Sequence, residues 1–353
     1  MSAEGTVGVG RQRHGGAWVA RSKAAGRLAV TVFVTLIGLL LLTFLIGRVM
    51  PVDPVLAIIG DQADEETYRK VFTQLGLDRP LYMQFLYYLH DIFTGNFGTA
   101  IATGHPVVQD IARVFPATME LATLALIGGV LFGVPLGILA AVYRGSWIDH
   151  LVRIFGLLGY SIPNFWLGLM ALVVFYAGLG WIGGSGRISF HNIGVVEPVT
   201  GSVLLDAMIA GNWEVAEDAF RHVVMPALIL ANTSMAYISR MTRSFMLEQL
   251  NQEYVTTARI KGLSGARVTW HAFRNIGVQL LTVIVLAYGG LLDGAVLTET
   301  VFGWPGFGQY LTAGLLTGDM NVVLTCTLMI GVIFLSLNML SDMLYRVLDP
   351  RTK

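Results

Sequence analysis

Six long segments of this chain contain no charged residue, and they constrain its fold more than any other feature. They are Leu28–Gly47, Leu121–Tyr143, Ile154–Gly186, Val223–Ser239, Asn275–Leu292 and Met320–Ser341. An α-helix needs about 20 apolar residues to cross about 30 Å of hydrocarbon, and each segment reaches or nearly reaches that length. Charged residues make up only 13% of the chain, against about 25% in a typical soluble domain. The sequence therefore predicts an all-α membrane protein with six transmembrane helices.

The same segments predict how the chain is organised. We expect a basic cytoplasmic tail at residues 1–27, followed by a first transmembrane helix at 28–49 and an external segment at 50–117. The membrane core then follows at 118–345 and a C-terminal tail at 346–353. The core helices are predicted at about 120–143, 154–181, 222–240, 276–297 and 320–343, with a polar loop at 241–275. The Gly/Arg-rich N-terminal tail is expected to be disordered.

Basic and acidic residues are distributed unevenly between the two sides of the predicted helices. With the N-terminus in the cytoplasm, 16 of the 23 Lys and Arg residues lie inside and 17 of the 23 Asp and Glu residues lie outside. Cytoplasmic loops carry an excess of Lys and Arg, so we predict that both termini are cytoplasmic. The first apolar segment is long and follows a polar, basic tail, so we expect a retained helix rather than a cleaved signal peptide.

The sequence lacks the patterns that catalysis or metal binding would require. None of the four lysines follows a glycine, so there is no Gly-x4-Gly-Lys-Ser/Thr loop for nucleotide phosphates. The seven histidines are scattered, without the spacing of a metal site. The single cysteine, Cys326, excludes a disulfide within the chain. We expect no enzymatic activity, no cofactor, no metal and no nucleic-acid partner, and we expect membrane lipid around the protein.

Four acidic residues occur close to the apolar segments: Glu120, Asp293, Glu299 and Asp342. Each is near a predicted helix end, where we expect water or lipid headgroups to solvate it. A charge near the middle of the bilayer is costly and usually marks an ion or proton relay. Because none is expected there, the sequence argues against the main alternative function, a secondary transporter that works without ATP. A regulatory or scaffolding membrane protein is the third alternative.

Small residues at helical spacing predict close packing of helices. Gly129, Gly133 and Gly137 recur once per turn in the second apolar segment, and Gly290 and Gly294 recur in the same way at the end of the fifth predicted helix. Glycine at this spacing lets helix backbones approach closely in lipid. The pattern indicates a packed bundle but does not identify a solute.

Pro163 and Asn164 interrupt the third apolar segment. A break inside a membrane helix frees backbone groups, which is tolerated where other helices or a cavity satisfy them. Polar side chains in these segments are candidates either for lining a solute pathway or for hydrogen bonds between helices. The candidates are Asn164, Asn232 and Ser234.

The polar loop between the fourth and fifth apolar segments carries the most functional information. Apolar residues at helical spacing predict a short helix from Glu253 to Lys261. Gly262 fits a left-handed stop after that helix, and Ser264 fits the N-cap of a second helix. The sequence therefore predicts a helix–turn–helix hairpin on the cytoplasmic face. A basic hairpin held at the membrane surface by its charge alone is the simpler interpretation.

The motif of this loop resembles a known family. The stretch Glu-Tyr-Val-x-Thr-Ala-Arg-x-Lys-Gly-Leu at 253–263, followed by His-Ala-Phe-Arg-Asn, is similar to the coupling loop of dipeptide/oligopeptide permeases of bacterial ABC importers. Further similar stretches occur in the same order at 76–81, 161–166, 299–308 and 349–351. The resemblance covers most of the chain from the first apolar segment onward.

This resemblance implies a type I ABC importer permease bundle in the bacterial inner membrane. Such a permease forms half of a translocation pathway and pairs with a second homologous permease, two ATP-binding subunits and an external solute-binding protein. The partners then bind and hydrolyse ATP, while this chain does no covalent chemistry. Peptides are the default substrate, and the resemblance leaves dipeptides, oligopeptides, glutathione, nickel chelates, opines and oligosaccharides open.

The resemblance also implies which residues contact the ATP-binding subunit. They are Tyr254, Thr256, Thr257, Ala258, Arg259, Lys261, Gly262 and Leu263. Bacterial ABC importers in general carry Glu-Ala-Ala-x3-Gly in this loop, and alignment on Gly262 places Thr256, Thr257 and Ala258 at the triplet. Thr256 therefore stands at the position of the glutamate, and Thr257 stands at that of the first alanine.

Overall fold

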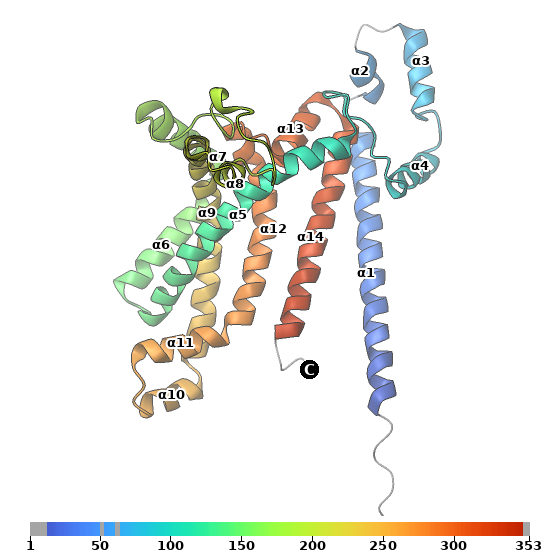
Figure 1. Ribbon diagram of the computed structural model, residues 1–353. Helices are drawn as coiled ribbons and strands as arrows, with labels where there is room; N and C mark the ends of the chain where they lie inside the picture. Colours follow the sequence, from blue (N-terminus) through green and yellow to red (C-terminus); the bar gives the residue numbers. More distant parts are fainter. Residues whose placement is uncertain (1–12, 50–52, 61–63, 349–353) are drawn as a thin grey trace, which may run out of the picture.

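The computed structural model describes residues 13–49, 53–60 and 64–348 (Figure 1). Every regular element in these ranges is helical, apart from an isolated bridge between Thr99 and Pro106. Five of the helices are long and apolar enough to cross a membrane. They are α1 (Arg13–Val49), α5 (Val107–Val142), α9 (Trp213–Leu250), α12 (Gly277–Phe302) and α14 (Met320–Leu348).

The third apolar segment forms a bent pair of helices rather than one helix. It consists of α6 (Trp147–Ser161), α7 (Asn164–Ala171) and the π-helical η1 (Leu172–Gly178). The bend between α6 and the α7–η1 stretch is 92°, so the break expected at Pro163 divides the predicted helix at 154–181 into two. Pro163 lacks an N–H and restricts the residue before it to extended conformations, and Ile162 has φ −88° and ψ 123°. The described residues contain six spans if the bent pair counts as one, and five otherwise.

Three of the helices extend well beyond their predicted ends. α5 begins at Val107 rather than at about 120. α9 exceeds the range 222–240 on both sides, and α1 begins at Arg13, inside the tail that we expected to be disordered. Once a helix has formed, each added residue gains one hydrogen bond, so polar flanks continue it outside the hydrocarbon. The expectation of disorder is therefore wrong from Arg13 onward. Residues 1–12 and the Asp349–Arg351 motif lie outside the described residues.

The close packing of α5 against α9 confirms the prediction from the glycine repeat. A Cβ atom added at Gly129, Gly133 or Gly137 would lie 2.2, 2.9 or 2.6 Å from an atom of α9. These distances are too short for any larger side chain, so glycine is required for the approach. Gly290 and Gly294 on α12 behave differently, because a Cβ at either position meets nothing within 4 Å.

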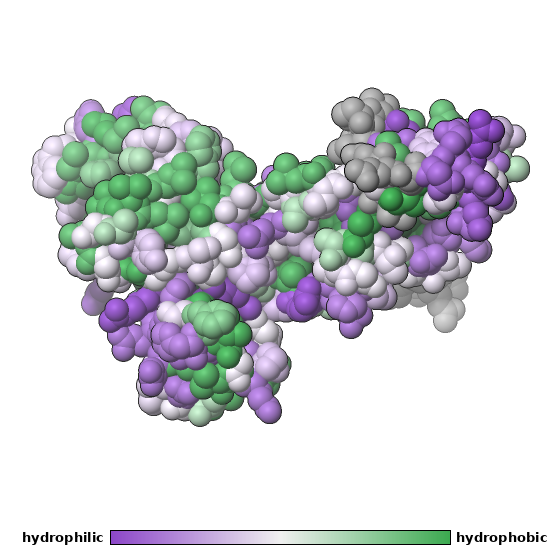
Figure 2. All heavy atoms as spheres, turned by 90° about the horizontal axis from the view of Figure 1, so that it is seen from above, coloured by the Kyte–Doolittle hydropathy of each residue, from purple (hydrophilic) through white to green (hydrophobic). Residues whose placement is uncertain are grey.

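Short helices cover the two ends of the bundle. One end carries α2 (Pro54–Ile59), α3 (Glu65–Gln74), α4 (Leu81–Phe93), η2 (Phe190–Asn192), α8 (Val203–Ile209) and α13 (Phe307–Thr317). The opposite end carries α10 (Glu253–Ile260), α11 (Gly265–Asn275) and the last described residues of α14 (Figure 1). Seen from above the first end, hydrophilic residues gather over α3 at the right of the molecule (Figure 2).

Glu120 is buried, which corrects the expectation that water or headgroups solvate it. Its side chain is 4% exposed and forms an ion pair with Arg187. The same carboxylate accepts a hydrogen bond from the hydroxyl of Ser202 at 2.6 Å. Asp293 and Asp342, by contrast, are exposed. The ion pair with Arg187 explains how Glu120 remains buried, because a buried charge is tolerated when it is paired and hydrogen-bonded.

Glu299 is also buried, and it holds the turn before α13. Its carboxylate accepts hydrogen bonds from the hydroxyl of Thr118 at 2.5 Å and from the backbone N–H of Gln309 at 3.0 Å. A Cβ at Gly306 would lie 2.5 Å from the carboxyl carbon of Glu299, so the turn requires glycine there. The expectation of a solvated Glu299 is wrong because α5, which is far away in the sequence, and the start of α13 together enclose its carboxylate.

Candidate coupling site

The predicted hairpin is formed by α10 and α11, which connect α9 to α12. Gly262 has φ +79°, as expected for a left-handed stop. Its N–H donates to the carbonyl of Arg259 at 2.9 Å, and the N–H of Leu263 donates to the carbonyl of Ala258 at 3.1 Å. Ser264 occupies the N-cap position of α11 but makes no side-chain capping bond. The turn is therefore set by Gly262 rather than by the serine hydroxyl.

The hairpin is firmly attached to the bundle through α11. Ala272 and Ile276 are fully buried in a cluster with Met246 of α9 and Ala141 of α5. Val255 of α10 is 1% exposed, so the first helix of the hairpin is also held on one side. Buried apolar contacts of this kind resist displacement because moving them would expose apolar surface to water. A force applied to the hairpin is therefore passed on to α9.

The other side of the hairpin faces solvent. The exposed residues of the predicted contact set are Thr256, Thr257, Arg259, Lys261 and Gly262, while Tyr254, Ala258 and Leu263 are half-buried. The hydroxyl of Tyr254 bonds to the side chain of Gln249 at 3.0 Å, which directs it back toward α9.

Two apolar side chains on the hairpin were missed by the sequence reasoning. Ile260 is 81% exposed and Trp270 is 61% exposed. Large apolar side chains that are exposed on a polar element are candidates for contact with another molecule. The available signal was the presence of an isoleucine and a tryptophan in a loop otherwise rich in polar residues.

A buried ion pair near the hairpin was also missed. The guanidinium of Arg243 on α9 donates to both carboxylate oxygens of Asp149 on α6, at 2.7 and 2.8 Å. Asp149 accepts a further hydrogen bond from the N–H of Gly145 at 3.0 Å. Bidentate pairs of this type fix both distance and orientation. The pair therefore joins α6 to the same helix that carries the hairpin.

The three polar residues considered for a solute pathway all make hydrogen bonds within the chain. Asn164 accepts from the hydroxyl of Thr233 at 3.0 Å, and Asn232 donates to the carbonyl of Gly159 at 3.2 Å. Ser234 is 4% exposed and lies between α5 and α9. These bonds join neighbouring helices, and the lining role of the three residues stays a prediction. Within the described part of the chain, no group of three or more His, Cys, Asp or Glu side chains could hold a metal ion.

Comparison with known proteins identifies the family. Residues 133–353 match the family described as binding-protein-dependent transport system inner membrane component, and residues 25–122 match the N-terminal region of such components. The chain belongs to this family. It is therefore a multi-pass permease subunit of the bacterial inner membrane and a component of a transport system.

Similar proteins cover nearly the same length. A probable D,D-dipeptide transport system permease protein of Escherichia coli (strain K12) is 43% identical over 318 residues, which is 89% of this chain and 92% of that protein. A di/tripeptide transport system permease protein of Pseudomonas aeruginosa is 41% identical over 321 residues, 90% and 95% of the two chains. A dipeptide transport system permease protein of Alkalihalophilus pseudofirmus is 36% identical over 319 residues, again 90% and 95%.

Proposed function

We propose that this chain forms half of the translocation pathway of an ABC importer for short peptides, driven by ATP hydrolysis on two partner ATP-binding subunits. The α10–α11 hairpin is the observation that carries the proposal. Its buried side is anchored through Ala272 and Ile276, while its free side exposes Ile260 and Trp270. The hairpin projects from one end of the bundle (Figure 1). Such an element suits docking into a cleft of a soluble partner.

The contact with the ATP-binding subunit uses the free side of this hairpin. Thr256, Thr257, Arg259 and Lys261 lie on it, and the positive side chains complement acidic groups on the partner. Ala258 allows close approach because its side chain is small. Tyr254, Gly262 and Leu263 contribute by shaping the hairpin. Gly262 and Leu263 form its turn, and the hydroxyl of Tyr254 bonds to Gln249 of α9.

Motion of the hairpin is passed to the pathway through three contacts. The buried cluster around Met246 carries it to α9. The glycine contacts of Gly133 and Gly137 carry it from α9 to α5, and the pair of Arg243 with Asp149 carries it to α6. Helices packed this closely move together, because interiors do not deform continuously. Alternating access then follows from movement of these helices relative to a second, homologous permease.

The proposed orientation places the hairpin end in the cytoplasm, together with both tails. In the hairpin, residues 253–275, Arg259, Lys261, Arg267 and Arg274 are basic, in agreement with the positive-inside rule. The opposite end, with α2–α4, α8 and α13, then faces the external solute-binding protein. ATP binds to the partner subunits, so this chain itself carries no cofactor.

Short peptides are the proposed substrate class. The relatives that are 43% and 41% identical to this chain are named for D,D-dipeptide and di/tripeptide transport. Oligopeptides, glutathione, nickel chelates, opines and oligosaccharides receive no comparable support from these names. We therefore propose dipeptides and tripeptides before the other solutes.

The alternative of a secondary transporter loses support from the contacts of the buried acids. Glu120 is paired with Arg187, and both carboxylate oxygens of Glu299 accept hydrogen bonds from protein donors. A proton or ion relay needs an acid that can exchange its partner for the transported ion. Through these contacts, both carboxylates instead stabilise the turns at the proposed external end of the bundle.

Uptake into liposomes tests the proposed function. The complete complex is reconstituted with ATP inside, and a labelled dipeptide is added outside together with the solute-binding protein. We expect uptake only when ATP, both permeases and both ATP-binding subunits are present. The isolated chain should show no uptake under a proton gradient. Accumulation driven by the gradient alone would contradict the ABC assignment.

A further inference from the structure

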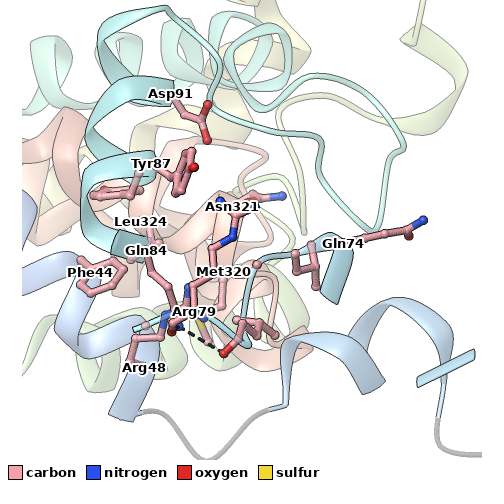
Figure 3. A pocket seen from close by; sticks show the side chains of 15 residues that line it. Phe44, Arg48, Gln74, Arg79, Gln84, Tyr87, Asp91, Met320, Asn321 and Leu324 are labelled. Carbon is pink, nitrogen blue, oxygen red and sulfur yellow. Dashed lines mark hydrogen bonds between the residues drawn. The ribbon is translucent and has the colours of Figure 1, made fainter. Parts of the chain in front are cut away.

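A pocket of about 500 Å³ lies between α1, α4 and α14, at the end of the bundle opposite the coupling hairpin. Arg48 is the last residue of the membrane span of α1, and Met320 is the first residue of the span of α14. The pocket therefore opens at the level where two spans leave the hydrocarbon. In Figure 3, Arg48 lies at the lower edge of this pocket and Asp91 at its upper edge.

Two guanidinium groups line the pocket without an acidic partner among the described residues. Arg48 lies 5.3 Å from the centre of the Phe44 ring, and Arg79 lies 4.5 Å from the centre of the Tyr87 ring. Neither guanidinium forms an ion pair or a hydrogen bond with another described residue. Each guanidinium presents five N–H donors, so the pocket offers many donors to an anion.

The side chain of Gln84 gives a second, independent indication of a ligand. It is 9% exposed and lines the same pocket. Its amide nitrogen donates to the carbonyls of Leu77 and Arg79, at 3.2 and 2.7 Å. Its Oε1 is buried and has no hydrogen-bond partner among the described residues. A buried acceptor without a donor is costly, so a ligand that supplies a donor here would be favoured.

We propose that this pocket binds the headgroup of a membrane phospholipid. Arg48 and Arg79 hold the phosphate, because guanidinium groups match the geometry of phosphate oxygens. An ammonium or hydroxyl of the headgroup donates to Oε1 of Gln84 after that side chain turns toward the pocket, since Oε1 is buried without the ligand. Phe44, Met320 and Leu324 form an apolar wall for the adjoining acyl carbons.

The position of the pocket favours lipid over a soluble ligand. It borders two membrane spans, and the neighbouring α4 exposes Tyr82, Leu86 and Phe93, side chains that suit the membrane interface. A lipid bound here connects α1 and α4 to α14. In the proposed orientation the lipid comes from the outer leaflet.

Lipid binding to the full chain in detergent tests this proposal, with bound lipid measured by native mass spectrometry. Phosphatidylethanolamine and phosphatidylglycerol should bind more tightly than phosphatidylcholine, whose trimethylammonium has no donor for Gln84. Diacylglycerol, which lacks the phosphate, should not bind. The double variant Arg48→Gln/Arg79→Gln should lose at least about tenfold in affinity, the size of one charge-assisted hydrogen bond. Arg69→Gln is the matched control, because Arg69 is exposed and paired with Glu65 at the same end.

Three results would overturn the proposal. The first is unchanged affinity for phosphatidylethanolamine in the double variant. The second is displacement of the lipid by inorganic phosphate or dialanine at concentrations similar to that of the lipid, which would assign the pocket to a soluble anion or zwitterion. The third is a double variant that binds lipid normally but no longer binds the external solute-binding protein, which would assign the arginines to that protein.

Discussion

Arg243 on α9 binds the carboxylate of Asp149 on α6 through two hydrogen bonds of 2.7 and 2.8 Å. The side chain of Asp149 is only 2% exposed, so the carboxylate depends on this partner and on the N–H of Gly145. The helix that carries the hairpin and the first half of the bent segment are thus joined by an ionic contact. This contact couples the start of α6 to motion of α9.

Loss of Arg243 should destabilise the chain strongly. Arg243→Met leaves the buried carboxylate of Asp149 without its partner, which costs on the order of 3–5 kcal/mol. Asp149→Leu combined with Arg243→Met removes both charges and should recover most of that loss. Thermal unfolding of the purified chain measures both effects. Arg221→Met is the matched control, because the pair of Arg221 with Glu217 on α9 is exposed and should contribute less than about 1 kcal/mol. An equal loss in Arg221→Met would contradict the account.

The turn of the hairpin should be sensitive to a side chain at Gly262 but not at Gly265. Both positions have open space around them, and only Gly262 has a positive φ. Gly262→Val therefore introduces strain of about 1–2 kcal/mol, enough to tilt the hairpin but too little to unfold the bundle. We expect normal membrane abundance, weaker co-purification of the ATP-binding subunits and reduced uptake. Gly265→Val should show none of these defects. Wild-type uptake with Gly262→Val would argue against a coupling role.

The contact between α5 and α9 should not tolerate a larger residue at Gly137. A Cβ there would lie 2.6 Å from the carbonyl oxygen of Ser239, and forced overpacking costs about 1–3 kcal/mol. Gly137→Val should lower the unfolding temperature of the isolated chain. Gly294→Val on α12 serves as the control, since its Cβ meets nothing within 4 Å. If Gly294→Val is as unstable as Gly137→Val, the packing described for α5 and α9 does not explain the effect.

The orientation in the membrane can be tested with reporter fusions. A reporter that is active only in the periplasm should be active when fused after Glu217 and silent when fused after Gly265. Glu217 lies near the start of α9, while Gly265 lies in the hairpin beyond the end of that helix. The basic residues of the hairpin favour a cytoplasmic location. Activity of the Gly265 fusion would contradict the proposed topology.

Those features of the structure that depend on one local pattern could be predicted from the sequence. Apolar runs predicted the spanning helices, because hydrocarbon thickness sets the length of apolar helix that is needed. The turn at Gly262 was predicted because a positive φ favours glycine. The glycine repeat from Gly129 to Gly137 predicted a close helix contact, because side-chain size alone controls the approach of two backbones.

Features that depend on distant residues could not be predicted in this way. Asp149 and Arg243 are 94 positions apart, and Thr118 and Glu299 are 181 apart, so neither member of a pair indicates the other. Pro163 predicted a break but not its 92° angle. That angle depends on where α7 packs, and α7 packs against α12 and α9. The helices that pack against α7 therefore set the bend angle, which the local sequence does not specify.

The most direct measurement of the central claim is cross-linking of the hairpin in the assembled complex. Thr257→Cys places a thiol on the free side of α10, while the native Cys326 is buried and should not react. With a short bifunctional reagent, we predict a cross-link between Thr257→Cys and an ATP-binding subunit, and loss of ATP-driven uptake once it has formed. Glu66→Cys on α3, at the opposite end, should give no such product. Absence of the Thr257→Cys product in an active complex, or full uptake after cross-linking, would contradict the assignment of this hairpin as the coupling element.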